Sequence, residues 1–177
     1  MKVAYQGVPG AFSHEACLAF LPDHQPLGEP TFARVAEAVI YGEADVGMLP
    51  LANDSVGPVA EVEEVLATYP LAIVARHKLP IRIHLLALAG TDLASLTTAV
   101  SHPMALKQCA RTLASLGLKA QPASNTAAAA QSLADPAMAV LASEAAASAY
   151  GLVIVRRNVH DDVDNATTFA VVARRDR

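Results

Sequence analysis

The chain is short of several residue types, and each shortage argues against a class of protein. Its 177 residues include no tryptophan and two cysteines, and 17% of them are charged. Cys17 and Cys109 lie too far apart in the sequence for a metal or redox motif, and two cysteines cannot build the dense disulfide framework of a small secreted domain. We expect buried free thiols in a reducing compartment, with a disulfide or a cysteine nucleophile as the alternatives.

Long runs of like charge and long apolar runs are also missing. The basic groupings are the pair Arg156-Arg157 and residues 174–177, and the net charge is -4. We therefore expect no nucleic-acid partner. No stretch reaches the roughly 18 uninterrupted apolar residues of a membrane span, and the first residues lack the apolar segment and cleavage site of a secretory signal. A cytoplasmic protein with no membrane partner is the expectation.

The residues that are present predict an α/β fold. A hydrophobic content of 53% in 177 residues suits one domain or two small lobes with a substantial core. Short β-like runs alternate with helical ones, which favours largely parallel sheets. We expect strands at 2–5, 46–50, 71–74, 81–89, 98–101, 138–141 and 169–172, and helices at 13–21, 33–41, 59–68, 104–116, 125–133 and 143–150. Ser13 is the expected N-cap of the first helix.

Residues 71–89 are nearly free of polar side chains apart from residues 76–78 and Arg82. This length is hard to fold as one strand, because strands are usually about 5–6 residues long. A crossover from a first lobe to a second at about Pro80 explains the stretch.

Two segments place a glycine- or proline-containing turn between a strand and a helix. They are residues 7–13 (GVPGAFS) and 101–109 (SHPMALKQC). The free backbone N–H groups and the dipole at a helix N-terminus suit an anion. Asn125 and Ser143 likewise open alanine-rich helices, although each alone is explained equally well as an N-cap. For His102 we favour a structural hydrogen bond over a chemical role.

Two further segments carry polar side chains at the ends of apolar runs. Residues 47–57 (GMLPLANDSVG) end a buried-looking strand, where ligands bind in α/β folds. Residues 161–169 (DDVDNATTF) precede the last apolar run. Their three aspartates lack the glycine and terminal glutamate of a calcium loop, and the histidines show no zinc-like spacing. We therefore expect no metal.

Taken in order, these four segments resemble the catalytic domain of the prephenate dehydratase family. The family patterns are Gly-x-x-Gly-x-Tyr/Phe-Ser, Pro-Ile-Glu-Asn-Ser-x-x-Gly, Ser-His-Pro-x-Ala-Leu-x-Gln-Cys and Asn-x-Thr-Arg-Phe, and the resemblance extends over residues 3–172. Apart from Leu51 in place of the isoleucine, three positions depart from them. Ala52 stands for the glutamate, Asp54 for the serine and Thr168 for the arginine.

The resemblance implies two α/β lobes of the periplasmic-binding-protein type II kind, with the active site in the cleft between them. Lobe 1 is expected at residues 1–79 plus 157–177, and lobe 2 at residues 80–156. Neither a regulatory ACT domain nor a chorismate mutase domain is expected, and a homodimer is the default assembly.

The activity implied is conversion of prephenate to phenylpyruvate with loss of water and carbon dioxide, without a cofactor. The resemblance makes Thr167 the acid catalyst. It places the small-molecule substrate, prephenate or its amino-acid analogue arogenate, against Ser13, Asn53, Ser55, Ser101, Asn125, Thr126, Ser143, Asn165, Thr168 and Phe169. Ser55 is proposed to take over from the serine lost at position 54.

The missing arginine leaves alternatives open. Its guanidinium would hold a substrate carboxylate, and a threonine cannot do so. His160, Arg156 or Arg157 could reach the same carboxylate. Two other functions fit the altered positions. One is a non-aromatising prephenate decarboxylase, although the retention of Thr167 counts against it. The other is a non-catalytic small-molecule binding module.

Overall fold

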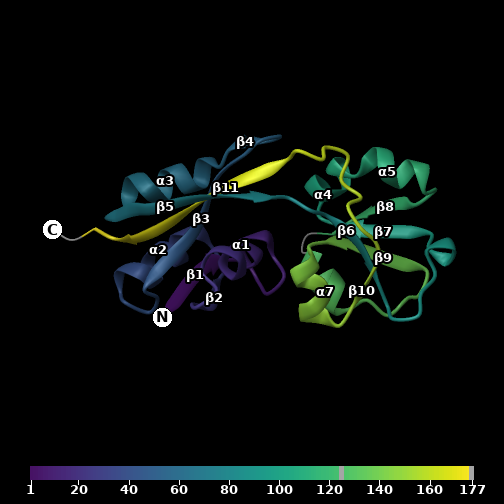
Figure 1. Ribbon diagram of the computed structural model, residues 1–177, viewed down its shortest axis with the longest axis horizontal. Helices are drawn as coiled ribbons and strands as arrows, with labels where there is room; N and C mark the ends of the chain where they lie inside the picture. The colour runs from purple at the N-terminus through teal and green to yellow at the C-terminus, as the bar shows by residue number, and fades with distance from the viewer. Residues whose placement is uncertain (124–125, 176–177) are drawn as a thin grey trace. The chain divides into compact units, whose positions relative to one another are not determined.

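The computed structural model describes residues 1–123 and 126–175, and the chain divides into two compact units. Unit 1 contains residues 1–8, 12–81 and 164–177, and unit 2 contains residues 9–11 and 82–163. Figure 1 shows a sheet with helices in each unit. The two units differ from the expected lobes in three places: residues 80–81 belong to unit 1, and residues 157–163 and the short loop Pro9–Ala11 belong to unit 2.

Unit 1 is built on a sheet in the order β2-β1-β3-β11-β5, with β4 paired to β3. Its strands are β1 (Lys2–Gln6), β2 (Gln25–Glu29), β3 (Val46–Asn53), β4 (Gly57–Pro58), β5 (Leu71–Pro80) and β11 (Ala166–Arg174). Its helices are α1 (Phe12–Phe20), α2 (Phe32–Ile40) and α3 (Ala60–Thr68). Helices α2 and α3 pack together on the core beneath β3 and β11, where Leu49, Ala170 and Val172 are fully buried.

Unit 2 is built on a second sheet in the order β10-β6-β9-β7-β8. Its strands are β6 (His84–Ala87), β7 (Thr98–Ser101), β8 (Lys119–Pro122), β9 (Met138–Ala142) and β10 (Val153–Arg156). A 3-10 turn, η1 (Leu93–Ser95), precedes β7, and the helices are α4 (Pro103–Gln108), α5 (Ala110–Ser115), α6 (Thr126–Gln131) and α7 (Glu144–Tyr150). Strands β7, β8 and β9 run parallel, so α4, α6 and α7 begin at the same edge of this sheet.

The chain leaves unit 1 along β5 and returns along β11, and these two strands pair side by side. β5 ends at Pro80, close to the crossover predicted from the sequence. The return segment is held within unit 2, because Val159 N–H donates to the Ile83 carbonyl (2.8 Å) and Asp161 N–H donates to the Gln108 carbonyl (2.7 Å).

The expectation of largely parallel sheets is wrong. Each sheet mixes parallel and antiparallel pairs, since β11 runs antiparallel to both β3 and β5, and β6 runs antiparallel to both β9 and β10. The strand that leaves unit 1, β5, and the strand that returns to it, β11, run in opposite directions and pair with each other. Strands and helices can therefore alternate along the chain without every strand pair being parallel.

Several predicted boundaries also differ from the structure. The predicted helix at 104–116 is two helices interrupted at Cys109, and α1 begins at Phe12, so Ser13 lies inside its first turn and is not the N-cap. The strands predicted at 71–74 and 169–172 extend to Leu71–Pro80 and Ala166–Arg174. The strand predicted at 81–89 is shorter, and Asn125 lies outside the described residues.

Candidate active site

Thr167 and Asn53 meet at one end of the first sheet. They are paired residues of β11 and β3. The Asn53 side-chain Nδ2–H donates to Thr167 Oγ1 at 2.9 Å and to the Ala166 carbonyl at 3.3 Å. The predicted catalytic residue is therefore bonded to a predicted substrate-binding residue from a segment more than a hundred positions away.

The orientation of the Asn53 amide follows from its other contacts. Its Oδ1 accepts hydrogen bonds from the backbone N–H groups of Ser55 (3.0 Å) and Val56 (3.2 Å), so its nitrogen must face Thr167. The hydroxyl of Thr167 thus accepts a hydrogen bond, and it donates none to any residue that the structure describes. Its proton is left available for a ligand.

Thr168 lies on the opposite side of β11 from Thr167, because successive side chains of a strand point to opposite faces. In the ladder it is paired with Ala52 on β3 and with Lys78 on β5. The Lys78 ammonium lies 2.9 Å from a carboxylate oxygen of Asp54. Lys78 was not among the residues predicted for the site. Residues 76–78 interrupt the apolar pattern, so the sequence places them between two predicted strands.

The other predicted residues of unit 1 are mostly enclosed. Ser13 is buried in α1, and Asn165 is buried just before β11, with its carbonyl accepting from Ile81 N–H at 2.9 Å. The Oδ1 atom of Asn165 is buried without a hydrogen-bond partner among the described residues. Phe169 is only 1% exposed. Its side chain belongs to the core, and a contact between Phe169 and the substrate stays a prediction.

In unit 2, Ser101 and Thr126 form a hydrogen-bonded cluster. The Ser101 hydroxyl donates to the Leu141 carbonyl (2.9 Å), so the contact of 3.2 Å between Ser101 and Thr126 uses the Thr126 proton. Thr126 Oγ1 also accepts from His102 N–H at 2.9 Å. Both hydroxyl protons are thus committed to the protein. His102 caps α4 through Nδ1, which accepts from Met104 N–H, in the structural role we expected.

Ser143 is the N-cap of α7, and its hydroxyl is fully engaged. It accepts from Ala146 N–H at 3.1 Å and donates to the Gly10 carbonyl at 2.6 Å. The side chain is 1% exposed. Ser143 therefore fastens the loop Pro9–Ala11 to α7, and Tyr150 assists it by donating to the Pro9 carbonyl at 2.7 Å.

Two of the cations expected to replace the missing arginine are already occupied. Arg157 forms two contacts with the Glu144 carboxylate, at 2.9 and 3.2 Å. His160 is buried, and its Nδ1 accepts from Ile83 N–H at 3.2 Å. The neighbouring His84 accepts from Asn158 N–H, and burial lowers its pKa, so the His84 imidazole is not placed as a free cation.

Nothing in the described residues points to metal or thiol chemistry. Residues 1–123 and 126–175 contain no group of three or more metal-ligating side chains. Cys17 and Cys109 are both buried and unbonded, and burial raises the pKa of each to about 12, which keeps the thiols protonated. Within the same residues no helix is long and apolar enough to cross a membrane.

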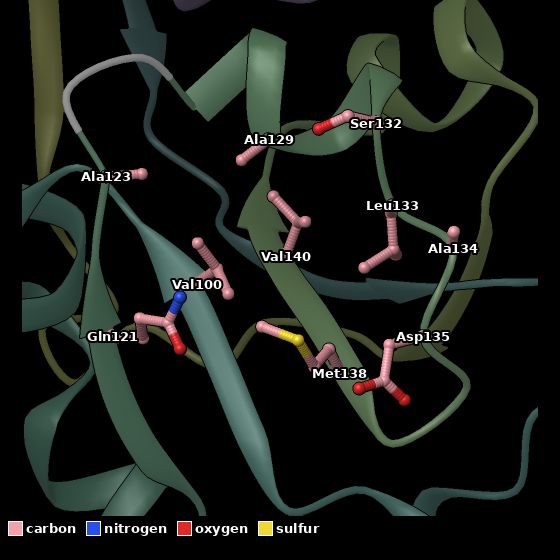
Figure 2. A pocket seen from close by; sticks show the side chains of 10 residues that line it. All are labelled: Val100, Gln121, Ala123, Ala129, Ser132, Leu133, Ala134, Asp135, Met138 and Val140. Carbon is pink, nitrogen blue, oxygen red and sulfur yellow. The ribbon is translucent and has the colours of Figure 1, made fainter.

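A separate cavity of about 580 Å³ lies in unit 2. Figure 2 shows Val100, Met138 and Val140 on its floor of β7 and β9, with Leu133 beside them. The polar side chains at its rim include Asp135, which accepts from Ala137 N–H at 2.8 Å and so serves the local turn. None of the described residues predicted for the site lines this cavity.

The fold places the chain in a broad class before its family is considered. An ABC-transporter periplasmic substrate-binding protein from Coxiella burnetii matches 99% of the chain with a TM-score of 0.51 at 13% identity. The fold is thus the two-lobed α/β fold of the type II periplasmic binding proteins. More specifically, the chain belongs to the prephenate dehydratase family, whose model matches residues 3–177.

The similar proteins with known names include dehydratases and an acylase. "Arogenate dehydratase/prephenate dehydratase 2, chloroplastic" from Arabidopsis thaliana is 38% identical over 98% of the chain and 46% of its own length. A structure described as "GqqA- a novel type of quorum quenching acylases" is 34% identical with a TM-score of 0.91, covering 100% of this chain and 65% of that one. The prephenate dehydratase of Arthrobacter aurescens, solved in complex with L-Phe, is 26% identical with a TM-score of 0.89, covering 100% and 61%. The chain thus spans less than two thirds of each of these relatives.

Proposed function

We propose that this chain dehydrates and decarboxylates prephenate, or its amino-acid analogue arogenate, with Thr167 as the acid. Membership of the prephenate dehydratase family supports the reaction class. The observation that carries the proposal is the hydrogen bond of 2.9 Å from Asn53 Nδ2–H to Thr167 Oγ1. It fixes the hydroxyl as an acceptor toward Asn53 and so directs its proton elsewhere.

The reaction needs the Thr167 hydroxyl as a donor when the ring hydroxyl group departs. As the ring carboxylate leaves as carbon dioxide, its bonding electron pair enters the ring, and the bond between the ring and its hydroxyl group breaks. The departing oxygen gains negative charge, which a donated hydrogen bond stabilises, and a proton completes the water molecule. Aromatisation supplies the driving force, so no cofactor is needed.

The choice of substrate is a finer part of the proposal. Relatives are named for prephenate and for arogenate dehydration. Arogenate carries an ammonium group where prephenate carries a keto group, and Asp54 brings a negative charge to the end of β3. A carboxylate there repels a dianion and attracts an ammonium, but the Lys78 ammonium 2.9 Å away offsets part of its charge. Both substrates are therefore tested.

The test is to incubate the chain with prephenate and with arogenate and to identify the products by absorbance and mass. Phenylpyruvate or phenylalanine, formed with loss of water and carbon dioxide, is the expected product. A product that has lost carbon dioxide alone would replace the proposal with the non-aromatising decarboxylase. Unaltered substrate that still binds would replace it with a binding module.

The role of Thr167 is tested by Thr167→Val, which keeps the shape and removes the hydroxyl. We expect kcat to fall by about 10²- to 10⁴-fold, the usual contribution of a positioned acid, with Thr167→Ser retaining most of it. Thr98→Val, at the start of β7, is the control outside the predicted site and should leave kcat within a few-fold. Wild-type turnover in Thr167→Val would remove Thr167 from the mechanism.

A further inference from the structure

Two of the three departures from the family pattern are neighbours in the first sheet. Ala52 and Thr168 stand where the pattern has glutamate and arginine, and they are paired directly across β3 and β11. Directly opposed side chains lie on one face of a sheet, with Cβ atoms about 5 Å apart. Both members of a potential ion pair are thus absent together from this chain.

An ion pair of this chain's own lies next to the vacated position. Lys78 is paired with Thr168 from the other side of β11, and its Nζ lies 2.9 Å from Asp54 Oδ2. Asp54 is the third departure from the family pattern. Two of the altered positions, Asp54 and Thr168, therefore lie next to one cation. The strand register brings Lys78 to the face of the sheet from which an arginine at position 168 would extend.

The ion pair is open to solvent, which limits its contribution to folding. The Lys78 side chain is 61% exposed and that of Asp54 is 42% exposed. Exposed pairs of this kind contribute little to stability. An ammonium group has three N–H donors, and the contact with one carboxylate oxygen leaves others for a ligand.

The ammonium group also lies at the end of the sheet that carries Thr167. Asp54 immediately follows Asn53, the residue that orients Thr167, and Asp54 N–H donates to the Ala166 carbonyl at 2.9 Å. Asp54 thus draws the Lys78 side chain toward the first residues of β11. The Thr167 and Lys78 side chains lie on opposite faces of the sheet but at the same end of it. A ligand bound at this end can therefore contact both the Thr167 hydroxyl and the Lys78 ammonium.

Three other cations of the described unit 1 are less well placed. Arg34 contacts three glutamates, Glu29, Glu37 and Glu43, at 2.9 to 3.5 Å. Arg175 donates to the Leu71 carbonyl at the other end of β5. Arg76 shares a face with Lys78 but is paired with Ala170, two positions further from the end of the sheet.

We propose that Lys78 binds a carboxylate group of the substrate in place of the arginine missing at position 168, with Asp54 holding the ammonium in position. This inference rests on the proposed function, because the ligand is the prephenate or arogenate carboxylate. It assigns Lys78 a role in affinity, and Thr167 keeps the role in the chemical step.

The test compares Lys78→Met with Lys78→Arg and with Arg76→Met, which removes a positive charge from the same strand and face. Loss of a charge-assisted hydrogen bond predicts that Lys78→Met raises KM by about 10- to 100-fold, with a smaller change in kcat. Arg76→Met should change KM only a few-fold, and Lys78→Arg should stay near wild type. The thermal midpoint of Lys78→Met should match that of the wild type, because the pair is exposed.

A rescue variant separates a direct role from general electrostatics. Thr168→Arg introduced into Lys78→Met restores the family arginine beside the missing cation, and it should recover most of the lost affinity. Equal losses in Lys78→Met and Arg76→Met, or an unchanged KM in Lys78→Met, would overturn the inference while leaving the dehydratase activity intact.

Calorimetric titration with prephenate and arogenate keeps the two proposals distinct. If the wild type binds either compound without turning it over, the proposed function fails, and weaker binding by Lys78→Met still supports the inference. If the wild type neither binds nor converts either compound, both proposals fall.

Discussion

At the scale of single residues, Asn53 performs two tasks that need the two ends of a side-chain amide. Its oxygen accepts from Ser55 N–H and Val56 N–H and so shapes the turn after β3. Its nitrogen donates to Thr167 Oγ1. A carboxylate could do only the first, and an aliphatic side chain could do neither.

The substitution Asn53→Asp separates these tasks. The new carboxylate keeps an acceptor for the turn, but its second oxygen faces Thr167 Oγ1 and accepts the hydroxyl proton that the substrate needs. We expect kcat to fall by about 10²-fold or more, within the range of a lost acid, while the circular dichroism spectrum remains native. Steady-state kinetics with the substrate found active provide the measurement.

Two further variants serve as controls for this prediction. Asn53→Ala removes both contacts, so it should lose activity and also lower the free energy of unfolding, by about 1 kcal/mol per hydrogen bond. In Asn53→Asp combined with Thr167→Val, no further loss beyond Thr167→Val alone is expected. Additive losses would show that Asn53 acts independently of the Thr167 hydroxyl.

The sequence could name Asn53 and Thr167 but not their contact. The motif resemblance identified both residues, whereas their pairing depends on the register of β11 against β3, to which no local pattern points. Lys78 was missed for a related reason. Its strand was predicted to end at Val74, because Arg76, His77 and Lys78 interrupt the apolar pattern, yet they continue β5 along its partner β11.

At the scale of elements, α5 depends on a side chain from a distant segment. Its own N-cap, Cys109, provides no side-chain hydrogen bond. Asp161 fills the role instead, accepting from Arg111 N–H (2.9 Å), Thr112 N–H (3.0 Å) and the Thr112 hydroxyl (2.9 Å). The return segment is thereby attached to the helix. Burial acts to raise the pKa of Asp161, but these hydrogen bonds outweigh it and lower the pKa.

Asp161→Ala is expected to lower the free energy of unfolding by about 1–2 kcal/mol, the usual cost of losing an N-cap. Asp161→Asn keeps an acceptor and should lose less. Because the folded pKa lies below the unfolded one, the charged carboxylate stabilises the fold above the unfolded pKa, and this contribution disappears as the pH falls through the folded pKa. Urea titrations between about pH 6 and pH 3 should therefore show a smaller acid loss in Asp161→Asn than in the wild type. Equal acid losses would mean that Asp161 is not the group responsible.

Two of the strands missed from the sequence, β2 and β8, are short and have little apolar pattern, whereas a third, β10 (VIVR), is apolar. β2 has the sequence QPLGE and β8 the sequence KAQP, and each lies at the edge of its sheet, where side chains stay exposed and proline is tolerated. The interior strands β1, β7 and β9 are buried and apolar, and all three were predicted. An edge strand of this kind forms by hydrogen bonding to its neighbouring strand, which its own sequence does not reveal.

At the scale of the whole molecule, the chain passes between the two units four times. Two of these passages flank the loop Pro9–Ala11, which belongs to unit 2 although β1 and α1 on either side of it belong to unit 1. Within unit 2 this loop is attached to α7 by hydrogen bonds from Ser143 and Tyr150 to its carbonyl groups. The loop therefore needs a close approach to α7.

Gly10 allows this close approach, so its replacement should lower the free energy of unfolding. Gly10 has φ +90°, and a Cβ atom there would lie 2.6 Å from the Ala146 Cα. Gly117 has φ +69° with nothing within 4 Å of a Cβ, so Gly117→Ala isolates the backbone cost, about 1–2 kcal/mol. Gly10→Ala should cost about 1–3 kcal/mol more because of the added crowding. Urea unfolding followed by circular dichroism gives both values, and equal costs would mean that the loop does not pack on α7 in solution.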